Sequence, residues 1–93
     1  MVVLKARILF LLPAYPSSRE RRRLTGRLVK AIPRYFNVSC AELDEERASP
    51  AVALGLACVS TTPRGARWRV QQVVSWLEEE AGAEVLEVQE DYC

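Results

Sequence analysis

No histidine occurs among the 93 residues of this sequence, and that absence excludes more chemistry than any other feature of its composition. Histidine is the commonest general acid or base in enzymes, and most zinc sites and Ser-His or Cys-His nucleophiles depend on it. The Ser, Lys and Glu residues that are present show no spacing that sets an activated nucleophile beside a base. We therefore expect a protein that is not an enzyme, with no catalytic residues, no cofactor and no small-molecule substrate.

Metal-binding patterns are missing as well. The three cysteines, Cys40, Cys58 and Cys93, form no CxxC pair, and their odd number is typical of a reducing compartment. The acidic run Asp44, Glu45, Glu46 lacks the glycine-punctuated loop of an oxygen-ligated calcium site, so we interpret it as a solvated turn. We expect free thiols at all three cysteines and no bound metal ion.

Long hydrophobic runs are also absent, since no stretch approaches the ~20 apolar residues that a membrane helix needs. The short apolar run Ile8–Leu12 follows Lys5 and Arg7 and ends at Pro13, which faintly resembles a signal peptide. The alternation upstream of this run indicates a strand instead. We expect a cytoplasmic protein that does not bind membranes.

Charge of both signs is present, but the two signs are unevenly distributed along the chain. Residues 1–34 contain nine basic residues and one acidic residue, whereas residues 35–93 contain four basic and eleven acidic residues. The first segment therefore carries +8 and the second −7, which sum to the net charge of +1. Such asymmetry predicts either a basic surface that meets nucleic acid or an acidic protein, or two halves that attract each other.

The basic residues concentrate in Ser17–Arg34, whose spacing predicts an amphipathic helix. Its apolar residues recur at helical intervals and form the expected core stripe, which consists of Leu24, Leu28, Ala31, Ile32 and Tyr35. Its cationic residues fall on the opposite side and are Arg19, Arg22, Arg23, Arg27, Lys30 and Arg34. Like charges at i,i+4 destabilise a helix, which favours an anionic partner, although an ordinary solvated surface stays an open alternative.

Local signals set the limits of this helix. Ser17 or Ser18 is a suitable N-cap, and Glu20 stands at the capping-box distance from Ser17. Proline lacks the backbone N–H that a helix interior needs, so Pro33 is expected to end or kink the helix near Ile32.

Four strands and a second helix complete the pattern. The predicted strands are Val2–Leu12, Asn37–Leu43, Ala51–Ser60 and Ala83–Glu90. An acidic turn, Asp44–Pro50, joins the second strand to the third in a hairpin that is expected to set Cys40 opposite Leu54. The second helix is capped by Thr61 or Thr62, has Pro63 at or near its first position, and stops at Gly82. The core stripe expected for this helix is Ala66, Val70, Val73, Val74, Leu77 and Ala81.

The order β-α-β-β-α-β predicts the fold of a single domain over residues 1–93. Right-handed crossovers give a four-stranded antiparallel sheet of order 4-1-3-2, with both helices on one face. This is the ferredoxin-like α+β fold. The open sheet face is expected to be apolar, because Ala51–Ser60 has apolar residues on both of its sides.

The segments SSRERRRL, YFNVSCAELD and VALGLACVS resemble the YlxP-like family of small bacterial proteins, which is catalogued as a domain of unknown function. The resemblance covers Val2–Glu90 and is most specific where Ser17–Arg23 is paired with Phe36–Ser39. The chain departs from the family pattern at Glu45–Ser49, where members carry a tryptophan, and at Pro33, where members continue the helix with charged residues.

This resemblance implies the ferredoxin-like fold and assigns no catalytic or cofactor residues. Members are often encoded beside translation and ribosome-maturation factors, so the resemblance also implies RNA or the ribosome as a partner.

Two functions stay open on the sequence. One is an RNA- or ribosome-binding module that uses the six cations of the first helix, with exposed Trp68 stacking on a base. Base stacking on the sheet is not expected, because Phe10 lies on the buried face and the third strand has no aromatic residue. The alternative is a homodimeric protein-interaction or assembly module without nucleic-acid binding, formed through the open sheet face or an edge strand.

Overall fold

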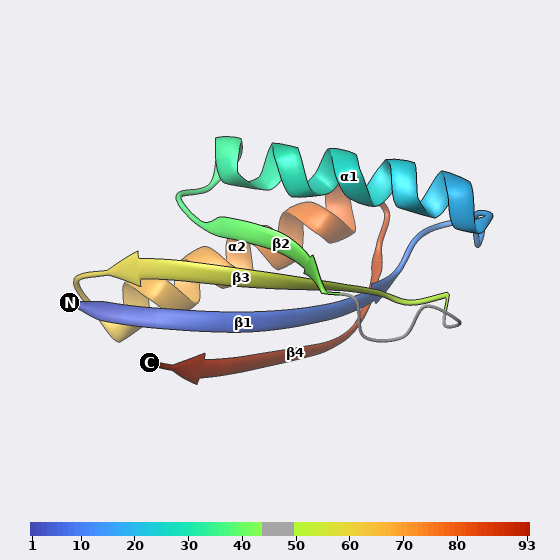
Figure 1. Ribbon diagram of the computed structural model, residues 1–93. Coiled ribbons are helices and arrows are strands. Elements are labelled where there is room, and N and C mark those ends of the chain that lie inside the picture. Colours follow the sequence, from blue (N-terminus) through green and yellow to red (C-terminus); the bar gives the residue numbers. More distant parts are fainter. Residues whose placement is uncertain (44–49) are drawn as a thin grey trace.

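A computed structural model describes residues 1–43 and 50–93 and has the element order β-α-β-β-α-β (Figure 1). The elements are β1 (Val2–Leu11), α1 (Ser18–Tyr35), β2 (Ser39–Leu43), β3 (Val52–Ser60), α2 (Pro63–Glu80) and β4 (Glu84–Tyr92). All six predicted elements are confirmed, with small differences at their ends. The predicted acidic turn lies outside the described residues except for Pro50.

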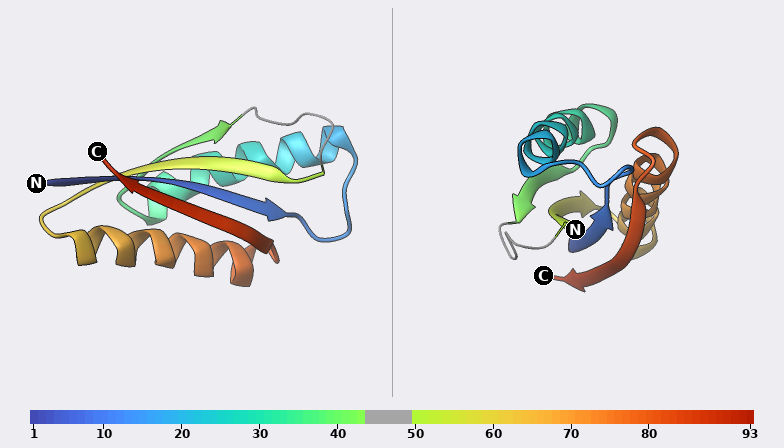
Figure 2. Two further views of the ribbon diagram at one scale, coloured as in Figure 1. Left: turned by 90° about the horizontal axis from the view of Figure 1, so that it is seen from below. Right: turned by 90° about the vertical axis from the view of Figure 1, so that its right-hand side faces the viewer.

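The strands form one antiparallel sheet of order β2-β3-β1-β4, which confirms the predicted ferredoxin-like topology. Both helices lie on the same side of this sheet, as the right-hand view of Figure 2 shows. The hairpin register differs from the prediction by two residues, because Cys40 pairs with Leu56 and Leu54 pairs with Glu42. A shift of two leaves every side chain on its predicted face, since side chains alternate with a period of two.

The core lies between the sheet and the two helices. The alternation of β1 sends Leu4, Ile8 and Phe10 into it with no exposed surface, and its other face is only partly covered. From the helices, Leu28 and Ile32 of α1 and Ala66, Val70, Val73 and Leu77 of α2 complete the packing. Val74 and Ala81, which the sequence placed in the core stripe of α2, are partly buried against it.

The helix α1 begins as predicted and ends later than predicted. Ser17 is its N-cap, and the hydroxyl of Ser17 accepts a hydrogen bond of 3.3 Å from the backbone N–H of Glu20. Pro33 was expected to end or kink the helix near Ile32, and the helix continues through Pro33 to Tyr35. Pro33 stands in the last turn, where its missing N–H removes a single hydrogen bond, and the N–H of Phe36 still donates to the Ile32 carbonyl at 2.9 Å.

Both ends of α2 follow the sequence prediction. Thr62 is the N-cap and accepts a hydrogen bond of 3.0 Å from the N–H of Gly65, and Pro63 occupies the first helical position. Gly82 has a φ of +64°, the left-handed conformation that ends helices, and the N–H of Ala83 donates back to the Leu77 carbonyl. Neither described helix is long and apolar enough to cross a membrane.

Candidate nucleic-acid interface

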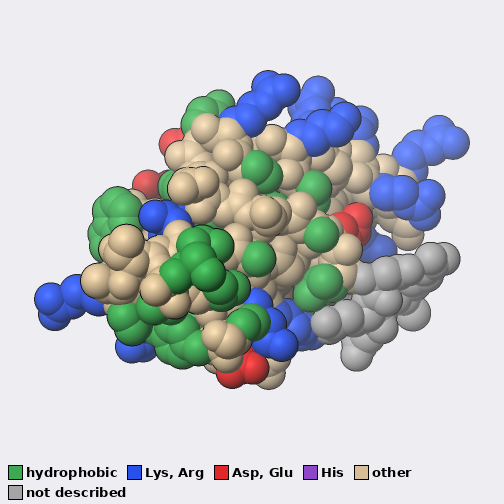
Figure 3. Space-filling view, turned by 60° about the vertical axis from the view of Figure 1, so that its left-hand side comes forward, with side chains coloured by type: hydrophobic (Ala, Val, Ile, Leu, Met, Phe, Trp, Pro, Cys, Tyr) green, Lys and Arg blue, Asp and Glu red, His purple; other side chains and the backbone are tan. Residues whose placement is uncertain are grey.

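Six basic side chains lie on the side of α1 that faces away from the sheet. The buried residues Thr25, Leu28 and Ile32 fix the orientation of this helix, so the opposite side is left to solvent. Basic side chains gather along the top of Figure 3, the position that α1 occupies in Figure 1. We call this surface the α1 ridge; its members, all exposed as predicted, are Arg19, Arg22, Arg23, Arg27, Lys30 and Arg34.

One cation of the α1 ridge, Arg23, forms an ion pair with a neighbouring carboxylate. Arg23 pairs with Glu20 one turn earlier, donating from Nε at 3.2 Å and from Nη2 to the second carboxylate oxygen. The hydrogen bond from Arg23 holds the pKa of Glu20 below its usual value. Within residues 1–43 and 50–93, the other five cations of the α1 ridge form no ion pair.

Tyr35 was predicted to belong to the core stripe of α1, and that prediction is wrong. Its side chain is 69% exposed, because the helix runs past Ile32 and turns this residue toward the flank of α2. There the ring of Tyr35 lies 5.8 Å from the ring of Trp76, at an interplanar angle of 40°. Thr25, which the sequence did not place in the core stripe, is buried instead of Tyr35.

Trp76 is half-buried, and it links Tyr35 to the core. Its ring meets Phe36 edge-on, with centroids 6.1 Å apart and planes at 76°, and Phe36 packs against the core cluster. The three rings therefore run from the hydrophobic core to the surface at the C-terminal end of the α1 ridge.

Trp68 is exposed, as predicted, with 61% of its surface accessible, but it lies on α2 and not on the α1 ridge. Its neighbour Arg69 is not a free surface cation. The Nη1 of Arg69 donates to the carbonyl oxygens of Val59 at 2.8 Å and Asn37 at 3.3 Å, and it lies 3.1 Å from the Cys58 sulfur. Arg69 thus ties α2 to the end of β3 and to the segment between α1 and β2.

The open face of the sheet is a second surface, and it is less apolar than expected. The β3 residues that face outward are Ala53, Gly55, Ala57 and Val59. In the same layer, however, Lys5 forms an ion pair of 3.9 Å with Asp91, and Arg7 forms one of 3.4 Å with Glu87.

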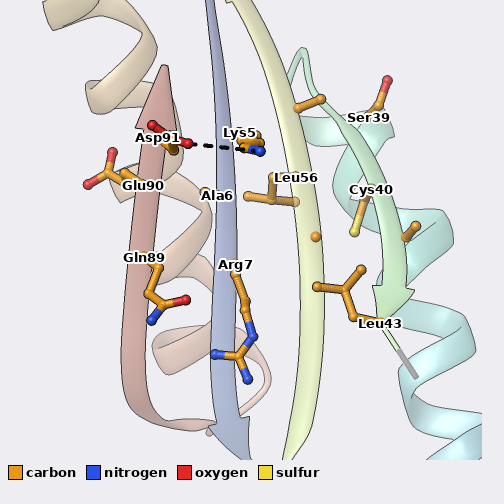
Figure 4. Close-up of a pocket in the computed structure, with 13 residues that line it drawn as sticks. Lys5, Ala6, Arg7, Ser39, Cys40, Leu43, Leu56, Gln89, Glu90 and Asp91 are labelled. Atoms are coloured by element: carbon orange, nitrogen blue, oxygen red, sulfur yellow. Dashed lines mark ion pairs between the residues drawn. The ribbon is translucent and has the colours of Figure 1, made fainter. Parts of the chain in front are cut away.

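The small side chains on β2 and β3 leave a shallow hollow of about 560 Å³ on this face (Figure 4). Its lining includes Ala41, Gly55 and Ala57. Lys5 and Arg7 of β1 lie between β3 and the lining residues Gln89, Glu90 and Asp91 of β4 (Figure 4). The alternation of β1 already set Lys5 and Arg7 on the face opposite the buried residues, and the structure confirms it. Their acidic partners on β4 depend on the strand pairing and did not follow from that alternation.

The three cysteines differ in exposure: Cys40 is partly buried and lines the hollow, Cys58 is buried, and Cys93 is exposed. All three are free thiols, which confirms the prediction. Burial raises the pKa of Cys40 to about 11, so its thiol is protonated at neutral pH. Among residues 1–43 and 50–93, no three His, Cys, Asp or Glu side chains cluster closely enough to hold a metal ion.

Comparisons with known proteins name no activity. The model of the family described as "Protein of unknown function (DUF503)" matches residues 3–90. A search of curated proteins found no match. Among solved structures, this chain is similar to the de novo designed protein Ferredog-Diesel, with 12% sequence identity and a TM-score of 0.46. The match covers 96% of this chain and 83% of the designed protein.

Proposed function

We propose that this chain, which belongs to the DUF503 family of proteins of unknown function, binds the phosphate backbone of RNA along the α1 ridge. The single observation that supports the proposal is a row of exposed cations without described counter-ions. Arg19, Arg22, Arg27, Lys30 and Arg34 are exposed, and no carboxylate in the part of the chain that the structure describes pairs with them.

The spacing of these residues suits a polyanion. Arg19 and Arg34 are fifteen positions apart, so the α1 ridge extends over about 22 Å of helix. A linear array of guanidinium groups matches successive phosphates, which arginine binds with two hydrogen bonds each. Such contacts position a nucleic acid without reading its bases, so we expect little sequence preference.

The finer assignments of this proposal come from the resemblance seen in the sequence. The YlxP-like segments favour a cytoplasmic, translation-associated partner such as ribosomal RNA. The absence of histidine favours a binding role without catalysis. Trp68 keeps a separate and smaller predicted role as a stacking residue, which Trp68→Ala tests alone.

The experiment compares two doubly substituted variants with the parent. Arg27→Gln with Lys30→Gln removes two charges from the α1 ridge, while Gln71→Glu with Ser75→Glu lowers the net charge equally at exposed positions of α2. We expect the ridge variant to bind RNA about tenfold more weakly at low salt and the α2 variant to bind nearly as the parent does. Fluorescence anisotropy with labelled RNA measures both.

Equal losses in the two variants would show that net charge alone attracts RNA, and the α1 ridge would then have no special role. An unchanged affinity in a correctly folded ridge variant would exclude the proposal, as would a parent without measurable affinity.

A second candidate, a homodimer formed through the open sheet face, is favoured by the hollow over Ala41, Gly55 and Ala57. Small side chains allow another backbone to approach closely, and the β2 edge beside them offers unpaired backbone groups. This surface lies on the side of the sheet away from the helices, so it does not compete with the α1 ridge.

Sedimentation equilibrium at micromolar concentration tests the dimer directly. We expect a species of twice the 10.5 kDa chain mass, and Ala57→Glu should return it to the monomer by placing a charge on the floor of the hollow. Finding only the 10.5 kDa species in the parent would exclude this candidate.

A further inference from the structure

We infer that the α1 ridge takes single-stranded rather than double-stranded RNA, with Tyr35 as the platform on which one base stacks. This inference rests on the proposed function and specifies its substrate. It begins from the position of Tyr35, which follows Arg34 directly at the C-terminal end of the α1 ridge and leaves most of its ring accessible.

The ring of Tyr35 is held in place and not merely exposed. Trp76 lies 5.8 Å away on one side of it, and Trp76 is in turn fixed by an edge-on contact with Phe36. Because Phe36 packs against the core, the position of Tyr35 is connected to the rigid part of the domain. A pre-positioned ring loses little conformational entropy when a ligand stacks on it.

An accessible aromatic ring that follows a row of cations along one helix is suited to an unpaired base. Bases within an RNA duplex are already stacked on each other, whereas bases in a single strand have free faces that bind tyrosine or tryptophan. Duplex RNA would use only the phosphate contacts of the α1 ridge. A single strand would gain the stacking contact as well, and its affinity should therefore be higher.

The structural alternative is that Tyr35 only shields Trp76 from water. In that case, truncating Tyr35 would lower the stability of the domain and would affect every nucleic acid alike. Tyr35→Phe is a control for the hydroxyl, because phenylalanine keeps both the shielding and the stacking surface and removes only that group.

The test measures the affinity of four proteins for a short oligouridine and for the duplex that it forms with oligoadenine of equal length. The proteins are the parent, Tyr35→Ala, Tyr35→Phe, and Tyr92→Ala as a matched control at an exposed tyrosine on β4. For Tyr35→Ala we expect about tenfold weaker binding of the single strand and unchanged binding of the duplex. Tyr35→Phe and Tyr92→Ala should bind both RNAs as the parent does.

Equal effects of Tyr35→Ala on the two RNAs, or no effect on either, would overturn the stacking inference. If Arg27→Gln with Lys30→Gln weakens binding while Tyr35→Ala does not, the α1 ridge stands and the stacking fails. A parent that binds neither RNA overturns both proposals together.

Discussion

At the scale of single residues, the sequence shows which positions carry apolar side chains but not how a helix is rotated about its axis. The pattern of α1 allowed a core stripe ending in Tyr35, whereas packing against the sheet buries Thr25 and exposes Tyr35. Both choices satisfy helical periodicity, since the two residues lie on opposite flanks of Leu28 and Ile32. The contact of Tyr35 with Trp76 joins two helices and cannot be read from local sequence.

Thr25 supplies a prediction at this scale. Its side chain is fully buried, and its hydroxyl has no hydrogen-bond partner among the residues that the structure describes. Valine has the same shape without the hydroxyl, and leaving a buried polar group unpaired costs about 1–3 kcal/mol. We expect Thr25→Val to raise the free energy of unfolding by about 1 kcal/mol, seen as a higher Tm in thermal denaturation.

Thr25→Ser is the matched control, because it keeps the hydroxyl and removes the methyl group. It should lower the Tm below that of the parent. A valine variant that is less stable than the parent would mean that the hydroxyl has a partner after all.

At the scale of elements, the ends of α2 and the faces of the sheet follow from the sequence because their signals are local. Thr62, Pro63 and Gly82 act within one turn of the chain, and the alternation of β1 needs no partner to be recognised. Pro33 misled the prediction of the end of α1 because its effect depends on position. In the last turn its missing N–H removes a single hydrogen bond, and the N–H of Phe36 still donates to the Ile32 carbonyl.

Gly26 supplies the prediction for the element α1. A side chain at this position would meet no atom within 4 Å, and its φ is not in the left-handed region. Glycine within a helix costs about 1 kcal/mol relative to alanine, so Gly26→Ala should raise the free energy of unfolding by about 0.5–1 kcal/mol. Chemical denaturation measures the change, and RNA affinity should be unaffected.

Gly65 is the contrasting position on α2. A Cβ there would come within 2.7 Å of the Ser60 hydroxyl and 3.0 Å of the Thr62 hydroxyl that caps the helix. Gly65→Ala is therefore expected to destabilise the domain. If Gly26→Ala also destabilises it, the space seen around Gly26 is not available to a side chain.

At the scale of the whole molecule, the basic first half and the acidic second half of the chain form ion pairs with each other at one place only among the described residues. Attraction between the halves was one explanation of the division of charge, and it occurs between β1 and β4, where Lys5 pairs with Asp91 and Arg7 with Glu87. Five cations of the α1 ridge are not neutralised in this way by the described residues: Arg19, Arg22, Arg27, Lys30 and Arg34. The surplus positive charge therefore collects on one side of the domain, opposite the open sheet face.

The pattern of the sequence was sufficient to predict this fold and to identify the exposed cations of the α1 ridge. It did not reveal the pairing of Arg23 with Glu20, the role of Arg69 in joining α2 to β3, or the aromatic contact at Tyr35. Each of these depends on a side-chain conformation or a distance between elements. Those quantities are fixed by packing and not by periodicity.

The most direct test of the central claim is the salt dependence of RNA binding, measured for the parent and for Arg27→Gln with Lys30→Gln. Each phosphate contact contributes about −0.7 to the slope of log affinity against log salt for a single strand. We predict that the slope of the variant is smaller in magnitude by about 1.4, with Gln71→Glu and Ser75→Glu leaving it unchanged. Identical slopes for the parent and the ridge variant would contradict the claim that these residues bind phosphates.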